Sequence, residues 1–146
     1  MRPKPWHHVM TGLSAAVLLG VTLFVAIRYG ALPEQIPTHF GPGGQADSFG
    51  PKSGIFFPLV MGWFLLALIT VLSFFPETWN VPRKSPRTLA AAADMIAVLR
   101  LVMALMFAWM TLCSALGRGL GGWFLPVSMI GVFAPLAYLI VESLRP

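Results

Sequence analysis

This chain has little charge and almost no cysteine. Only 10% of its 146 residues are charged, whereas 57% are hydrophobic, and soluble domains carry about 25% charged residues. A soluble protein of this length could not hide so much apolar surface from water, so the composition excludes an ordinary soluble domain and favours a protein dissolved in lipid. The single cysteine, Cys113, excludes an intrachain disulfide.

The sequence also lacks the motifs of several enzyme classes. We find no G-x-S-x-G elbow, no H-E-x-x-H helix, no C-x-x-C pair and no phosphate-binding P-loop. The net charge of +5 comes from few residues, which lie mostly between apolar runs. This placement is typical of membrane topology signals, and we therefore expect no nucleic-acid partner.

Four apolar segments are long enough to cross a bilayer, which takes about 20 helical residues. They span residues 9–29, 55–75, 95–116 and 123–141. The first is too long for the core of a signal peptide and has no cleavage site after it, so we expect it to be retained.

Because backbone groups in lipid must be paired internally, all four should be helices. The sequence predicts an all-α membrane protein with a single domain over residues 1–146: a four-transmembrane-helix bundle whose structured extracytoplasmic loop, residues 30–54, joins helices 1 and 2. The glycine-rich residues 117–122 should form the short third loop.

The positive charges predict an orientation. One side of the predicted bundle carries six Lys and Arg residues and the other carries three. The six are Arg2, Lys4, Arg83, Lys84, Arg87 and Arg145; the three are Arg28, Lys52 and Arg118. Since cytoplasmic segments are enriched in Lys and Arg, both termini are predicted to be cytoplasmic.

Two ionisable residues fall near or within the third apolar segment. We expect the third helix to begin near Ser85, ahead of its apolar segment, so that Asp94 lies at the membrane interface and Arg100 extends its side chain back to the headgroups. The alternative is a buried ion pair between Arg100 and either Asp94 or Glu142.

The loop between the first two helices has an unusual composition. Four prolines restrict its backbone and four glycines permit turns: Pro33, Pro37, Pro42, Pro51, Gly41, Gly43, Gly44 and Gly50. Ile36, Phe40 and Phe49 supply apolar side chains that could hold the loop against the bundle. We therefore expect a shaped loop rather than a flexible linker.

The loop also carries the polar residues that suit chemistry, and His39 with Asp47 is the pair of most interest. A His with a carboxylate can bind a metal, relay a proton or form an orienting hydrogen bond. A divalent metal would need a third ligand, for which Glu34 is the candidate. His7 and His8 lie on the opposite side of the predicted bundle and cannot join. The remaining polar residues of the loop are Thr38, Gln45, Ser48 and Lys52.

The same loop resembles a known family signature, L-P-x-x-[IV]-P-x-H-[FW]-x-x-x-G-x-x-D-x-[YFW]-x-x-K. Ten positions agree over 21 residues: Leu32, Pro33, Ile36, Pro37, His39, Phe40, Gly44, Asp47, Phe49 and Lys52. The family consists of bacterial membrane proteins of unknown function, and the same domain forms the N-terminal part of SdpI-like proteins, which are associated with immunity to secreted peptide toxins and with signalling. Gly41 stands where the family often has Asn, and the chain ends after four predicted helices, without the C-terminal helices of full SdpI-like proteins. The resemblance implies that His39, Gly44, Asp47 and Lys52 act as a set in a bacterial cytoplasmic membrane.

Three functions follow as hypotheses. In the first, the outer loop of a non-enzymatic SdpI-like protein recognises a peptide, a lipid or a partner protein, with Glu34, Thr38, His39, Gly44, Asp47 and Lys52 binding the ligand or organising the loop. In the second, His39 and Asp47 serve a membrane-embedded enzyme or metal-binding protein. In the third, the chain is a small accessory subunit of a larger membrane complex. A homo-oligomer is also expected, because four short helices form a small bundle.

Overall fold

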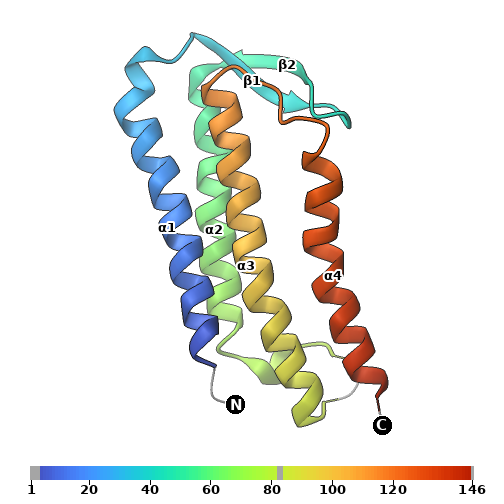
Figure 1. Ribbon diagram of the computed structural model, residues 1–146. Helices are drawn as coiled ribbons and strands as arrows, with labels where there is room; N and C mark the ends of the chain where they lie inside the picture. Colours follow the sequence, from blue (N-terminus) through green and yellow to red (C-terminus); the bar gives the residue numbers. More distant parts are fainter. Residues whose placement is uncertain (1–3, 82–83, 146) are drawn as a thin grey trace.

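The computed structural model describes residues 4–81 and 84–145, which fold as four long helices covered at one end by a two-stranded hairpin (Figure 1). The helices are α1 (Pro5–Arg28), α2 (Phe56–Leu72), α3 (Pro86–Ala115) and α4 (Phe124–Leu144), and the antiparallel strands are β1 (Gln35–Phe40) and β2 (Ala46–Pro51). Short 3-10 helices, η1 (Tyr29–Ala31), η2 (Lys52–Ile55) and η3 (Pro76–Thr78), lie between them. The predicted four-helix architecture is confirmed, and the structured loop proves to be a hairpin.

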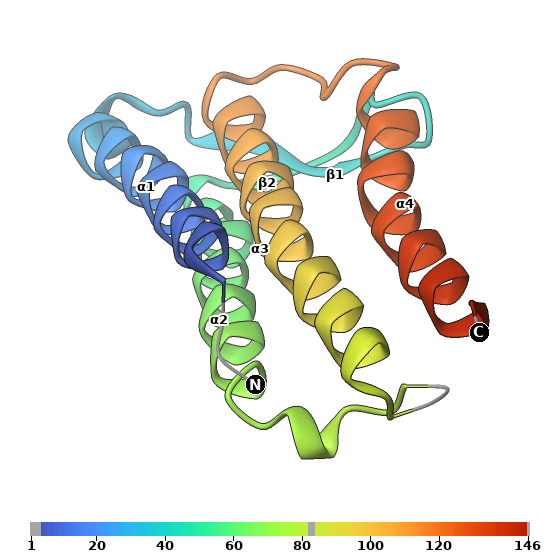
Figure 2. The same ribbon diagram turned by 60° about the horizontal axis from the view of Figure 1, so that its bottom comes forward.

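Helix α3 is the centre of the bundle, because it packs against each of the other three helices. Figure 2 shows α1 and α2 on one side of α3 and α4 on the other. The buried positions of α3 include several alanines: Ala91, Ala92, Ala97, Ala104 and Ala115. Small side chains let helix backbones approach closely, which is how helices pack in lipid, where apolar burial alone gives little driving force.

Two helices begin earlier than their apolar segments. Helix α3 starts at Pro86, directly after Ser85, whose hydroxyl oxygen accepts a hydrogen bond from the Thr88 backbone N–H at 3.1 Å. Helix α1 starts at Pro5. Capping by Ser and a proline in the first turn both favour a helix start. The apolar pattern marks only the part of a helix that lies in hydrocarbon, so it cannot place these polar first turns.

The outward faces of the helices are apolar. Large side chains are widely exposed along them, such as Phe57 (72%), Ile130 (66%) and Phe133 (54%). All four helices are long and apolar enough to cross a membrane, by length and composition. Exposed apolar surface on this scale would be untenable in water. The chain is therefore a multi-pass membrane protein.

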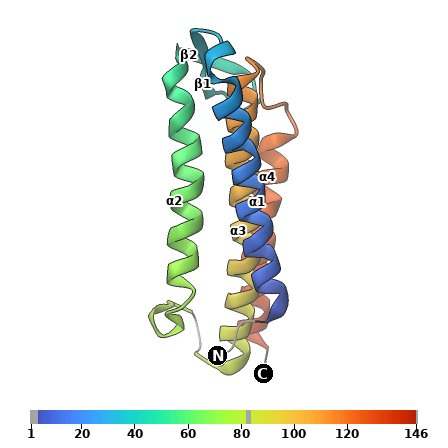
Figure 3. The same ribbon diagram turned by 90° about the vertical axis from the view of Figure 1, so that its left-hand side faces the viewer.

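The two ends of the bundle differ in structure. The hairpin and the α3–α4 loop lie together at one end, called here the hairpin end, and both chain termini lie near the other, called the termini end (Figure 1). Viewed from the side, α2 lies opposite α1 and α3, and the hairpin lies across the ends of these helices (Figure 3). Each end carries its own polar groups, and the two sets are considered separately below.

Candidate functional site

The hairpin is fixed to the bundle by buried apolar side chains at its base. Ile36 of β1 and Ile55 of η2 are both 0% exposed and pack with Leu32, Val25 and Ala115. These residues come from α1, α3 and the hairpin segment, so burial ties the hairpin to two helices at once. The predicted anchoring by Ile36 is confirmed. The predicted anchoring by Phe49 is wrong, because this side chain is 57% exposed; a bulge in the strand pairing breaks the alternation on which such a prediction depends.

The tip of the hairpin is fixed by a backbone contact with the α3–α4 loop. The Leu120 N–H donates to the Gly44 carbonyl oxygen at 2.6 Å, and the Trp109 indole Nε1–H donates to the Leu120 carbonyl at 3.0 Å. Gly44 is buried and has φ +78°, a conformation that favours glycine. A Cβ at this position would also lie 2.8 Å from the carbonyl carbon of Gly121. Gly44 therefore organises the loop.

His39 and Asp47 meet across the hairpin. Their Nδ1 and Oδ1 atoms are 2.6 Å apart, and the side chains are 70% and 43% exposed. An ionised carboxylate can only accept, so Nδ1 must carry the hydrogen. A neutral His39 then presents Nε2 as a hydrogen-bond acceptor. The pair is an oriented, solvent-accessible polar group at the hairpin end of the protein.

The other predicted polar residues form a second pair and a packing contact. The Lys52 ammonium donates to Glu34 Oε1 at 2.9 Å and lies 5.6 Å from the centre of the Tyr29 ring. Thr38 packs by its methyl group, since a Cβ added at Gly50 would lie 3.0 Å from it. Glu34 is thus engaged by Lys52. Within residues 4–81 and 84–145, no three His, Cys, Asp or Glu side chains gather to hold a metal ion, and metal binding by His39 and Asp47 stays a prediction.

A second polar cluster, missed by the sequence analysis, lies at the termini end. Asp94 of α3 accepts hydrogen bonds from the Lys4 ammonium at 2.8 Å and pairs with His7 Nε2 at 2.8 Å. The Lys4 backbone N–H donates to His7 Nδ1, so Nε2 of a neutral His7 carries the hydrogen that Asp94 accepts. The signal was available in the sequence, because two histidines and a lysine precede the first apolar segment on the side where Asp94 enters the membrane. In the sequence analysis Lys4 enters only the orientation prediction, and His7 and His8 enter only as excluded metal ligands of the loop.

The predicted ion pairs of Arg100 are wrong, and extension of its side chain to the headgroups stays a prediction. The residue is only 6% exposed, so it is buried within the bundle. It pairs with neither predicted carboxylate: Asp94 is held by Lys4 and His7, and Glu142 is held by Arg87 and Arg145, each at 2.7 Å. Instead, Arg100 Nη1 donates to the Thr11 hydroxyl at 2.6 Å.

Comparison with known proteins places the hairpin within a protein family model. The architecture defines a multi-pass membrane protein with a hairpin between its first two helices. Residues 16–62, which include the hairpin, match the family model described as a domain of unknown function (DUF1648). An uncharacterised protein of the archaeon Archaeoglobus fulgidus is 35% identical over 68 residues; the match covers 41% of this chain and 37% of that protein. No solved structure matches.

Proposed function

We propose that this chain is an SdpI-like membrane protein of the immunity or signalling type, whose hairpin recognises an extended peptide at the outer face of the membrane. The observation that carries the proposal is the open edge of β2. Within the described residues the sheet has only two strands, and the middle of β2 is exposed from Asp47 to Phe49. An exposed strand edge offers backbone N–H and C=O groups to a peptide that adds as a third strand.

The side chains around this edge suit a peptide better than a lipid. Phe49 gives an exposed apolar contact, and the His39–Asp47 pair beside it gives hydrogen-bond acceptors, the free Nε2 of a neutral His39 and the Asp47 carboxylate. The hairpin is held at its base by Ile36 and at its tip by Gly44, so it would lose little conformational entropy on binding. Main-chain pairing supplies affinity, while side chains at alternate positions supply specificity.

Peptide recognition predicts that His39→Ala and Asp47→Ala weaken binding without unfolding the protein. Both side chains are substantially exposed, and such substitutions usually change stability by less than about 0.5 kcal/mol. Losing one hydrogen bond to a charged group should weaken binding by about tenfold. Cells expressing the chain are challenged with secreted peptide toxins. Where the chain protects the cells against a toxin, binding of that toxin to the purified protein is measured in detergent micelles.

The control is Glu34→Ala, which removes a carboxylate at the hairpin base that is more exposed than Asp47 (85% against 43%) and leaves the His39–Asp47 pair intact. Full protection and unchanged affinity in both the His39→Ala and Asp47→Ala variants would refute recognition through this pair. A stable complex with another membrane protein that survives both substitutions would instead support the accessory-subunit hypothesis. Stoichiometric metal lost in His39→Ala would support the metal-binding hypothesis.

The orientation belongs to the same proposal: the hairpin end lies outside and the termini end lies in the cytoplasm. Lys4, Lys84, Arg87 and Arg145 are at the termini end, whereas Arg28, Lys52 and Arg118 are at the hairpin end. Arg2 and Arg83, which the prediction also counted, lie outside the described residues. The excess of positive charge at the termini end favours the cytoplasm for that end.

Cysteine labelling in intact cells tests the orientation. A Cys113→Ala background removes the natural thiol from α3 and puts a good helix former in its place. Ser48 in β2 and Glu77 in η3 are both exposed, at opposite ends of the bundle. We expect a membrane-impermeant maleimide to label the Ser48→Cys variant in intact cells and the Glu77→Cys variant only after permeabilisation. The reverse pattern would overturn the orientation.

A further inference from the structure

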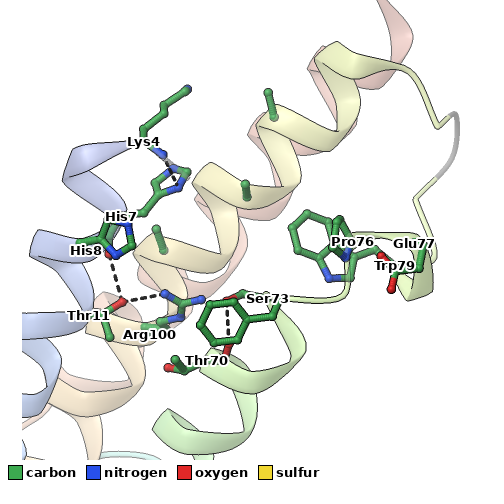
Figure 4. A pocket seen from close by; sticks show the side chains of 14 residues that line it. Lys4, His7, His8, Thr11, Thr70, Ser73, Pro76, Glu77, Trp79 and Arg100 are labelled. Atoms are coloured by element: carbon green, nitrogen blue, oxygen red, sulfur yellow. Dashed lines mark hydrogen bonds between the residues drawn. The ribbon is translucent and has the colours of Figure 1, made fainter. Parts of the chain in front are cut away.

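A cavity of about 580 Å³ opens at the termini end, far from the hairpin. It lies between the start of α1, the end of α2, η3 and α3, and its polar lining includes Arg100, Thr11, Thr70, Ser73 and His8 (Figure 4). Phe74, Pro76 and Trp79 supply an apolar wall. Ligand pockets typically have volumes of about 300–1,000 Å³ and combine an apolar lining with a few polar groups.

Arg100 is the unusual group in this cavity. Its side chain extends from α3 towards Thr11 of α1 (Figure 4) and donates to that hydroxyl, which itself donates to the His7 carbonyl. Arg100 is 6% exposed, and its Nε has no hydrogen-bond partner among the described residues. A hydroxyl satisfies a hydrogen bond but does not balance a positive charge. The guanidinium therefore retains both an unpaired donor and an uncompensated charge.

The nearby carboxylates do not supply the missing charge. Asp94 is already paired with Lys4 and His7, and Glu142 is already paired with two arginines. Glu77 lines the cavity but is exposed, and within the described part of the chain it forms no ion pair with Arg100. Since a buried charge is costly without an opposite charge, the site is suited to an anion from outside the chain.

We propose that this cavity binds a phosphate-type oxyanion through Arg100. The planar guanidinium is suited to phosphate because it can donate two parallel hydrogen bonds, and its unpaired Nε provides a donor for this purpose. Thr70 adds a second free group, because its buried hydroxyl also has no partner among the described residues. The apolar wall next to these donors suits a phosphate that carries an organic substituent.

Two sources share this chemistry: the headgroup of an anionic phospholipid and a soluble phosphate. Full-length protein is purified in mild detergent, stripped of lipid and titrated with dihexanoyl phosphatidylglycerol, with dihexanoyl phosphatidylcholine and with inorganic phosphate. Binding is read as a saturable rise in the thermal unfolding midpoint. A response to phosphatidylglycerol alone assigns the site to an anionic lipid, and a response to inorganic phosphate as well assigns it to soluble phosphates.

Arg100→Gln should weaken binding at least tenfold, and Arg118→Gln is the matched control because Arg118 is an exposed arginine in the α3–α4 loop. The control should keep the wild-type affinity within twofold. Without ligand, Arg100→Gln should unfold at a higher temperature than wild type, because it removes an uncompensated buried charge; a purely structural arginine would give the opposite shift.

Thr70→Val keeps the shape of the side chain and removes the free hydroxyl, so it tests the cavity independently if Arg100→Gln folds poorly. We expect it to weaken binding several-fold. The proposal is overturned if neither phosphatidylglycerol nor phosphate shifts the wild-type midpoint, or if Arg100→Gln or Thr70→Val binds with wild-type affinity. The hairpin proposal is unaffected by either result, because it concerns other residues at the other end.

Discussion

Replacing Gly44 by alanine should cost about 3 kcal/mol of stability, the largest effect of a single methyl group that we expect in this protein. Two penalties act together. The positive φ of +78° is unfavourable for a residue with a Cβ, and that Cβ would collide with the backbone of Gly121. Relieving the collision requires the tip to move away, which breaks the hydrogen bond from Leu120 N–H to the Gly44 carbonyl.

Alanine substitutions at two other glycines distinguish the penalty of a positive φ from the penalty of the Cβ collision. Gly117 lies two residues after the end of α3 and has φ +63°, but a Cβ there would meet nothing within 4 Å. Gly117→Ala should therefore show the backbone penalty alone, about 1 kcal/mol. At Gly43 an added Cβ would meet only the flexible end of the Gln45 side chain, so Gly43→Ala should be close to neutral. The free energy of unfolding is measured by denaturant titration in micelles, and cleavage at the hairpin tip by limited proteolysis.

The expected order of destabilisation is Gly44→Ala, then Gly117→Ala, then Gly43→Ala, with faster proteolysis of the tip only in the first. If Gly44→Ala and Gly117→Ala destabilise equally, the contact between the hairpin tip and the α3–α4 loop contributes no stability, and the preorganised hairpin in our functional proposal loses one of its two supports.

Ile36→Ala should destabilise the protein by about 2–5 kcal/mol, the range for truncating a large aliphatic side chain in a well-packed core. Ile36 is 0% exposed and packs with residues of the first helix and of η2. Its loss leaves a cavity that the surrounding backbone cannot fully close, because the hairpin is also held at its tip. The measurement is again the free energy of unfolding in micelles.

Phe49→Ala is the natural comparison, because Phe49 belongs to the opposite strand of the same hairpin and is 57% exposed. Its removal should change stability by no more than about 0.5 kcal/mol while weakening peptide binding. The two substitutions thus separate support of the hairpin from recognition. A larger loss of stability for Phe49→Ala than for Ile36→Ala would contradict the packing described here.

The apolar segments predicted the four-helix architecture because lipid restricts the conformations of the backbone. In lipid a chain must satisfy its backbone hydrogen bonds within each segment, so a long apolar run permits little besides a helix. The same runs could not place the polar first turns of α1 and α3. Ser85 and the prolines Pro5 and Pro86 set those starts by local capping preferences that hydropathy does not register.

The loop was predicted correctly in kind and incorrectly in detail. Its prolines and glycines indicated a shaped segment, and the His39–Asp47 contact is present. The prediction that Phe49 anchors the loop was wrong, because the irregular pairing of the two strands changes which side chains face the bundle. Glu34 was considered together with His39 and Asp47, yet its partner is Lys52, 18 residues away in the chain.

Local composition is enough to predict that the chain lies in lipid, that it has four long helices and that one loop is organised. Which charges pair depends on how the helices pack. Lys4 and Asp94 are 90 residues apart, and Arg100 and Thr11 are 89 apart, so no local pattern links them. Pairing depends on how α1 and α3 pack against each other. That packing leaves Arg100 buried beside a cavity, with its Nε–H unpaired among the described residues.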